Sequence, residues 1–119
     1  MFDFEKLIAY QKARNVNIKI QKLLIEIKVS AFLRDQLYRA SISMVINIAE
    51  GTGKLSKSDR KNFYVISRGS VFECASLLEM LYDEKIVNNQ ELNNLKNDLE
   101  EVSRLLSGLI NSFTKKLTL

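Results

Sequence analysis

The chain has 119 residues, a formal net charge of +4 and a pI of about 9.2. Apolar residues make up 46% and charged residues 27%, which is typical of one soluble globular domain and excludes a disordered chain. Proline is absent and there are only four glycines, so the many tight turns of a β-rich fold are excluded and long helices are expected.

The first predicted helix begins at Asp3 or Phe4 and ends at about Lys28. Apolar residues at helical spacing form its buried stripe: Ala9, Ala13, Val16, Ile20, Leu23 and Ile27. Three lysines on another side, Lys12, Lys19 and Lys22, give this helix a cationic exterior. Ser30 is expected to cap the N-terminus of the helix that follows.

The second predicted helix, from Ala31 to Gly51, is apolar on nearly all sides. Its single polar stripe consists of Arg39, Ser43, Asn47 and Glu50. Two apolar strips flank this stripe: Leu37, Ala40, Met44 and Ile48 form one, and Tyr38, Ile42, Val45 and Ala49 form the other. Three neighbouring helices of a small bundle would cover only one strip, so the other is predicted to need a second copy of the protein.

The third predicted helix begins after the turn at residues 51–55, where Ser56 to Asp59 resembles a capping box, and ends at about Asp83. Its predicted inner face consists of Phe63, Ile66, Ser70, Cys74, Leu77 and Leu81. Asn88 or Asn89 is expected to cap the fourth helix, which carries a heptad seam: Leu92, Leu95, Leu99, Val102, Leu106, Leu109 and Phe113. Residues 1–119 are therefore predicted to form one all-α domain, an antiparallel up-down four-helix bundle.

Positive charge is concentrated in the N-terminal part of the chain. Residues 1–72 contain 13 Lys and Arg against 6 Asp and Glu, whereas residues 73–119 contain 5 against 8. Four basic residues surround the turn before the third helix: Lys54, Lys57, Arg60 and Lys61. Together with the first-helix lysines they are candidates for binding the phosphate backbone of RNA or DNA. The alternative is that these residues only form solvated helix surfaces.

Catalysis is not expected, because histidine is absent and no pattern of metal ligands is present. The single cysteine, Cys74, is predicted to be a buried core residue, and no cofactor or metal is predicted. An enzyme that uses Glu50 with a bound cation is a weaker alternative. There is no leader-like N-terminus and no apolar run of about 18 residues, so a cytoplasmic protein without a membrane span is expected.

Several sequence blocks indicate a family. They are Phe4-Glu5-Lys6-Leu7, Tyr10-Gln11-Lys12-Ala13, Gln36-Leu37-x-Arg39-Ala40-Ser41-x-Ser43, Asn47-Ile48-Ala49-Glu50-Gly51, and Arg68-Gly69-Ser70 followed by Glu73. In their order and spacing the chain resembles the bacterial four-helix bundle proteins encoded in intervening sequences of 23S ribosomal RNA genes. That family is similar in fold to the accessory proteins of diversity-generating retroelements, which bind reverse transcriptase and nucleic acid.

The resemblance implies a bundle that assembles into a cyclic homopentamer. In such an assembly we expect a polar network, either between the second and third helices or across the subunit boundary, made by Arg39, Asn47, Glu50, Arg68 and Glu73. The expected function is that of a non-enzymatic oligomeric accessory protein that binds nucleic acid. The alternative is a protein-interaction scaffold for a nucleic-acid enzyme such as a polymerase or reverse transcriptase.

Overall fold

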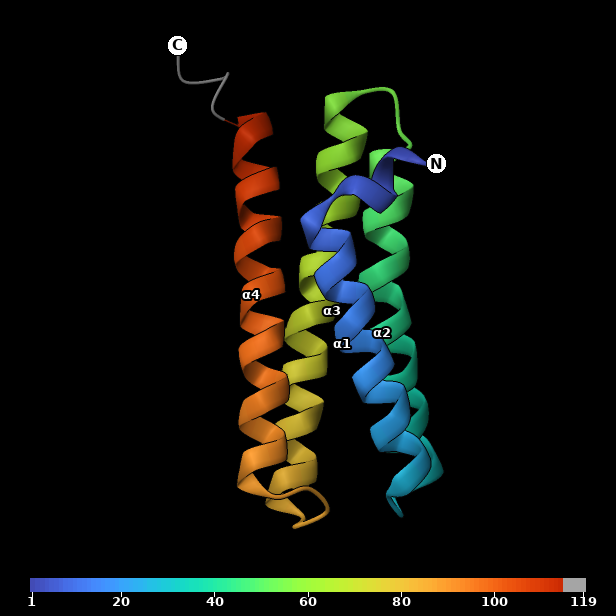
Figure 1. Ribbon diagram of the computed structural model, residues 1–119, viewed down its shortest axis with the longest axis vertical. Coiled ribbons are helices and arrows are strands. Elements are labelled where there is room, and N and C mark those ends of the chain that lie inside the picture. Colours follow the sequence, from blue (N-terminus) through green and yellow to red (C-terminus); the bar gives the residue numbers. More distant parts are fainter. Residues whose placement is uncertain (115–119) are drawn as a thin grey trace.

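A computed structural model of the chain describes residues 1–114, and every regular element within them is helical (Figure 1). A short 3-10 helix, η1 (Asp3–Lys6), precedes four α-helices: α1 (Ile8–Glu26), α2 (Ala31–Thr52), α3 (Lys57–Asp83) and α4 (Asn89–Thr114). The α2–α3 connection lies at one end of the molecule, beside the N-terminus, and the other two connections lie at the opposite end. The predicted all-α, antiparallel four-helix bundle is confirmed, with dimensions of 49 × 30 × 22 Å.

Side-chain caps begin three of the helices at the predicted residues. The Ser30 hydroxyl accepts a hydrogen bond from the Leu33 backbone N–H at 3.2 Å, and the Ser56 hydroxyl accepts one from Asp59 N–H at 3.1 Å. Asn88 caps α4 through a reciprocal pair with Glu91, with bonds of 2.8 and 2.9 Å. Each cap satisfies a backbone N–H that has no partner inside its own helix, and so it fixes where the helix begins.

The prediction of one continuous helix from Asp3 to Lys28 is wrong. Leu7 has extended backbone angles and separates η1 from α1. Aromatic contacts hold this bend, because Phe4 lies 5.5 Å from Phe2 and 4.7 Å from Tyr10 between ring centroids. At its other end α1 stops at Glu26.

Arg34 of α2 defines the C-terminus of α1. Its guanidinium donates hydrogen bonds to the carbonyl oxygens of Leu24 and Ile27, the second at 2.8 Å. These carbonyls lie in or next to the last turn of α1, where intrahelical N–H donors are lacking. A residue of the next helix therefore completes the end of this one.

The core is built mainly from the predicted apolar stripes. In α1, α2 and α4 the following members of these stripes are buried: Ala9, Ala13, Val16, Ile20 and Leu23; Leu37, Ala40, Met44 and Ile48; Leu92, Leu95, Leu99, Val102 and Leu106. Ile27, Leu109 and Phe113 are half-buried against this core. The second apolar strip of α2 is half-buried, and its Tyr38 is exposed.

The predicted inner face of α3 is partly wrong. Ser70, Cys74 and Leu81 are buried as predicted, but Phe63 and Leu77 are only half-buried and Ile66 is exposed. The helix is rotated so that another stripe enters the core: Tyr64, Ser67, Val71, Cys74, Leu78 and Leu81. Ser67 explains the rotation, because this small residue lies against α2 and its hydroxyl donates to the Met44 carbonyl oxygen at 2.6 Å.

Candidate nucleic-acid and subunit interfaces

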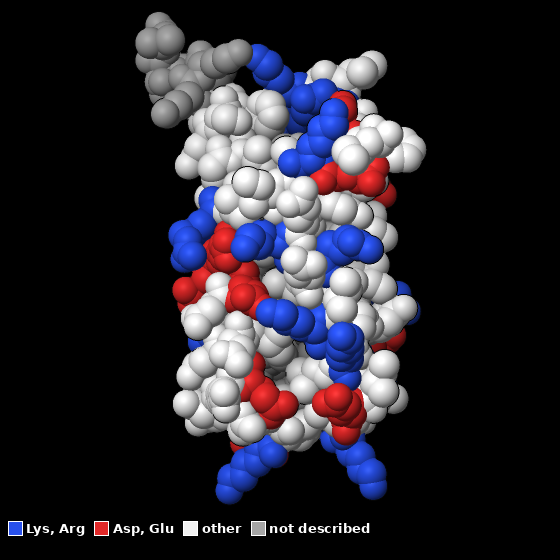
Figure 2. Space-filling model, in the orientation of Figure 1, with Lys and Arg blue, Asp and Glu red and all other residues white. Residues whose placement is uncertain are grey.

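The predicted nucleic-acid-binding residues fall on two separate surfaces. Along the side of the bundle, Lys12 of α1 forms an ion pair with Glu101 of α4 at 3.2 Å, and Lys19 pairs with Asp98 at 2.7 Å. Figure 2 shows acidic and basic side chains interspersed over this face of α1 and α4. The acidic residues reduce the positive potential here, and within residues 1–114 only Lys22 of the three predicted lysines lacks an ion-pair partner.

The other four predicted residues cluster at the α2–α3 end of the bundle. Lys54 lies in the connection, 5.0 Å above the Phe63 ring, and the Arg60 side chain donates to the Lys54 carbonyl oxygen at 2.6 Å. Lys57 and Lys61 lie in the first two turns of α3. Asp59 is the only acidic residue between positions 51 and 72 of the sequence. This end of the molecule therefore carries the densest positive charge among the predicted sites, and we call it the basic end.

The five residues of the predicted polar network do not join one another within a subunit. Arg39 pairs with Asp35 on the same helix at 2.9 Å, and Asn47 donates to Ser43. Arg68 turns toward α4, where it donates to Ser107 at 3.0 Å. Glu50 and Glu73 are exposed. The network between α2 and α3 of one chain is therefore absent from residues 1–114, while the version across a subunit boundary stays a prediction.

Short hydroxyl side chains make the polar contacts between α2 and α3 instead. Ser43 and Ser70 share a hydrogen bond of 2.8 Å, and Thr52 shares one of 2.8 Å with the Tyr64 hydroxyl. The sequence signal for this contact is the spacing of Ser67, Ser70 and Cys74, which puts small residues on neighbouring turns of α3.

Large apolar side chains remain exposed on three helices; on α1 they are Ile8, Ile18 and Ile25. On α2 they are Phe32, Tyr38 and Ile46, and on α3 they are Val65, Ile66, Phe72, Met80 and Tyr82. The described part of α4, in contrast, exposes none. Gly69 is also exposed; apart from its chain neighbours and its own helix backbone, no atom of residues 1–114 lies within 4 Å of a β-carbon added there. A surface of this kind is typical of a protein interface.

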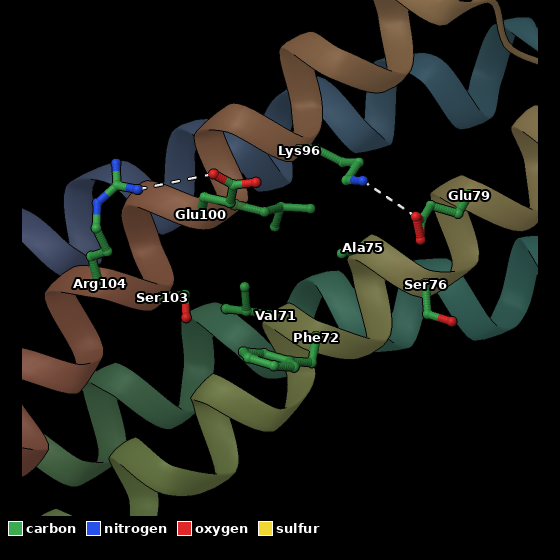
Figure 3. A pocket seen from close by; sticks show the side chains of 10 residues that line it. Val71, Phe72, Ala75, Ser76, Glu79, Lys96, Glu100, Ser103 and Arg104 are labelled. Carbon is green, nitrogen blue, oxygen red and sulfur yellow. Dashed lines mark hydrogen bonds and ion pairs between the residues drawn. The ribbon is translucent and has the colours of Figure 1, made fainter.

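A groove of about 430 Å³ lies between α3 and α4 (Figure 3). Its floor is apolar and consists of Val71, Phe72, Ala75 and Leu99. Charged residues stand at its edges, where Lys96 pairs with Glu79 at 3.2 Å and Arg104 lies 4.0 Å from Glu100. The groove is open to solvent, and its apolar floor with charged edges has the character of a surface that contacts other side chains.

Cys74 is buried in the core, as predicted. Burial, with a smaller contribution from the negative charge of Glu73, raises its pKa from 9.0 to about 12. Because the folded state holds the thiol proton more tightly, this contribution to stability is complete below about pH 9 and is lost as pH rises toward 12. The thiolate, which is the nucleophilic form, is therefore scarce at neutral pH.

We expect Cys74 to react with iodoacetamide at pH 8 far more slowly in the folded protein than in urea. Mass spectrometry of samples quenched over time measures both rates. The urea-unfolded chain is the control, since it exposes the same thiol. Equal rates in the two states would contradict the burial of this residue.

Two kinds of site are absent from residues 1–114. No group of three or more Cys, Asp or Glu residues is placed to hold a metal ion, and Glu50 therefore belongs to no such group. None of the described helices has the length and apolar character needed to cross a membrane.

The fold and these surfaces define a class: an antiparallel four-helix bundle with a basic end and with large apolar side chains exposed on its helices. The sequence matches the family described as 23S rRNA-intervening sequence protein over residues 5–108, and the chain belongs to this family. A crystal structure of a protein with unknown function from the S23 ribosomal protein family of Bacteroides thetaiotaomicron has the same fold. It is 23% identical, with a TM-score of 0.81, and the match covers 87% of this chain and 98% of that chain. No curated protein matches the sequence.

Proposed function

We propose that this protein is a non-enzymatic, homo-oligomeric accessory protein that binds the phosphate backbone of RNA or DNA through its basic ends. The observation that carries this proposal is the cluster of Lys54, Lys57, Arg60 and Lys61 at one end of the bundle, with Asp59 as the only acidic residue of that segment. Backbone phosphates bind to such surfaces with little sequence preference, because the attraction is electrostatic.

The exposed apolar residues of α2 and α3 support the oligomeric part of the proposal. A second copy of the chain would cover them, and Arg39, Glu50 and Glu73 on the same helices could then find partners across the boundary. Cyclic symmetry places equivalent atoms of all subunits at one height along the axis, so the basic ends would form a ring. In the cyclic pentamer that the family resemblance implies, five chains of +4 would total +20.

Charge reversal at the basic end tests nucleic-acid binding. We expect the double variant Lys57→Glu and Lys61→Glu to bind a fluorescent RNA or DNA duplex at least about tenfold more weakly, because two phosphate contacts are lost. The slope of log K against log salt concentration should become shallower by about two. Fluorescence anisotropy at two salt concentrations measures both. Acidic residues are favourable in the first turns of a helix, so α3 should stay folded.

The matched control is the double variant Lys28→Glu and Lys85→Glu, which makes the same charge change at the opposite end of the bundle. This control should retain most of the affinity. If the wild-type protein shows no binding at low salt, or binding that does not depend on salt, the nucleic-acid function is refuted. If both double variants lose affinity equally, the site is not at the basic end.

The alternative, a scaffold for a nucleic-acid enzyme such as a polymerase or reverse transcriptase, is favoured by the apolar surface of α2 and α3. In that case the tagged protein should retain one protein partner from a lysate of its own cells after nuclease treatment. Loss of all partners after nuclease would instead favour direct nucleic-acid binding.

A further inference from the structure

We infer that the outer side of α2 in one subunit docks into the α3–α4 groove of the next subunit, so that subunits join head to tail. This inference rests on the proposed oligomer and names the two surfaces that make it. A ring of more than two subunits requires two different, complementary surfaces on each chain. The exposed side of α2 and the α3–α4 groove are two such surfaces.

The first surface is a stripe along α2, formed by Phe32, Asp35, Arg39, Ile42 and Ile46. These residues recur in steps of three and four and therefore lie on one side of the helix. Phe32 and Ile46 are exposed, and Ile42 is half-buried. We call this set the α2 stripe. It combines apolar side chains that can enter a groove with one acidic and one basic side chain, one turn apart, that can meet charges at its edge.

The second surface is the groove between α3 and α4. Phe72 is 55% exposed on its floor, and the Arg68 guanidinium lies over its ring, 4.6 Å from the centroid. Lys96, Glu100 and Arg104 follow one another at steps of four along α4 and alternate in sign. Figure 3 shows them along one side of the groove, with Val71 and Phe72 opposite. Apolar side chains of a docked helix would therefore meet the floor and its charged side chains would meet this row.

The two charge patterns are complementary in either direction of docking. If α2 runs antiparallel to α4, Asp35 meets Arg104 and Arg39 meets Glu100. If it runs parallel, Asp35 meets Lys96, and Arg39 again meets Glu100. Contact between Arg39 and Glu100 is thus common to both arrangements. Both residues now make only exposed pairs within their own helices, at 2.9 and 4.0 Å, and such pairs are weak enough to exchange partners.

A mixing experiment tests this arrangement. Ile46→Glu damages the α2 stripe and leaves the groove intact, whereas Phe72→Glu damages the groove and leaves the stripe intact. We expect light scattering to give more than two chains for the wild-type protein and one chain for each variant alone. An equimolar mixture of the variants should form a species of two chains, because one intact stripe still meets one intact groove.

The matched control is Ile18→Glu, the same substitution on α1 at similar exposure: Ile18 is 39% exposed and Ile46 is 47% exposed. Ile18→Glu should keep the wild-type mass.

A second test exchanges charges between the two surfaces. Arg39→Glu and Glu100→Arg should each raise the protein concentration needed for assembly by at least about fivefold, and the double variant should assemble at the wild-type concentration again. Circular dichroism checks that all variants remain helical.

The outcomes separate this inference from the proposed function. A wild-type oligomer whose mass is unchanged by both Ile46→Glu and Phe72→Glu would overturn the inference and leave the oligomer standing. The inference would also be overturned if the two variants did not associate on mixing. A wild-type mass of two chains would overturn it as well, because that mass indicates a symmetric dimer. A wild-type protein that is a single chain at micromolar concentration would refute the oligomer as well.

Discussion

Replacing Leu106 with alanine is expected to lower the free energy of unfolding by about 2–5 kcal/mol. Leu106 of α4 is 0% exposed and belongs to the heptad seam at the centre of the bundle. Truncation removes apolar area from the core and leaves a cavity that the packed helices fill only partly. Urea denaturation followed by circular dichroism measures the change. Protein concentration must be equal in all samples, because association stabilises the folded state.

Leu55→Ala is the matched control for this prediction. Leu55 lies in the α2–α3 connection and is 99% exposed, so the same side-chain deletion leaves no cavity. We expect its effect on the free energy of unfolding to stay within about 0.5 kcal/mol. Equal destabilisation by the two substitutions would show that the seam of α4 does not form the core.

Replacing Gly51 with alanine is expected to lower the free energy of unfolding by about 1–3 kcal/mol, although alanine is the better helix former. Gly51 is buried near the end of α2, where α2 and α3 approach each other closely. A β-carbon at this position would lie 2.9 Å from Cβ of Phe63 and 3.2 Å from the Arg60 carbonyl oxygen. Both atoms belong to or adjoin the backbone of α3, so relief of the clash requires the helices to separate.

Gly108→Ala makes the same substitution where space is free. Gly108 lies inside α4 and is exposed; apart from its chain neighbours and its own helix backbone, no atom of residues 1–114 lies within 4 Å of a β-carbon added there. Here the helix propensity of alanine should raise the free energy of unfolding by about 0.5–1 kcal/mol. The two glycines should therefore respond with opposite signs in urea denaturation. Equal responses would contradict the close approach of α2 and α3 at Gly51.

Much of the helical framework could be predicted because it depends on local signals. Ser30, Ser56 and Asn88 begin helices since their side chains accept hydrogen bonds from nearby backbone N–H groups, and no distant residue is needed. The bend at Leu7 could not be predicted in this way. Aromatic contacts of Phe4 with Phe2 and Tyr10 hold it, and helical periodicity does not report such contacts.

The rotation of α3 could not be predicted from local signals either. The spacing of apolar residues predicted Ile66 to be a core residue, whereas the structure buries Ser67 and exposes Ile66. A serine can be buried at low cost when its hydroxyl has a partner, and the partner here is the Met44 carbonyl oxygen. That partner belongs to another helix, 23 residues away in the sequence. Periodicity within α3 alone contains no information about it.

The candidate site, too, could be predicted from the sequence only in part. The sequence predicted which residues are basic, but it did not separate Lys12 and Lys19, which acidic residues of α4 engage, from the residues of the basic end. One of the two predicted versions of the polar network placed Arg68 against α2 of its own chain, whereas within the chain Arg68 contacts Ser107 of α4. Ion pairs between helices depend on which sides of them meet, and this is decided when the bundle packs.

The sequence by itself determined most of the helical framework, the caps of α2, α3 and α4, the family and the apolar excess of α2, because each of these follows from residue type and local spacing. Tertiary structure alone decided which stripe of α3 is buried, which of the predicted lysines pair with acidic residues of α4, and where an apolar groove opens beside a row of alternating charges. The physical reason is that burial and ion pairing depend on two surfaces in contact. The sequence of one helix describes only one of these two surfaces.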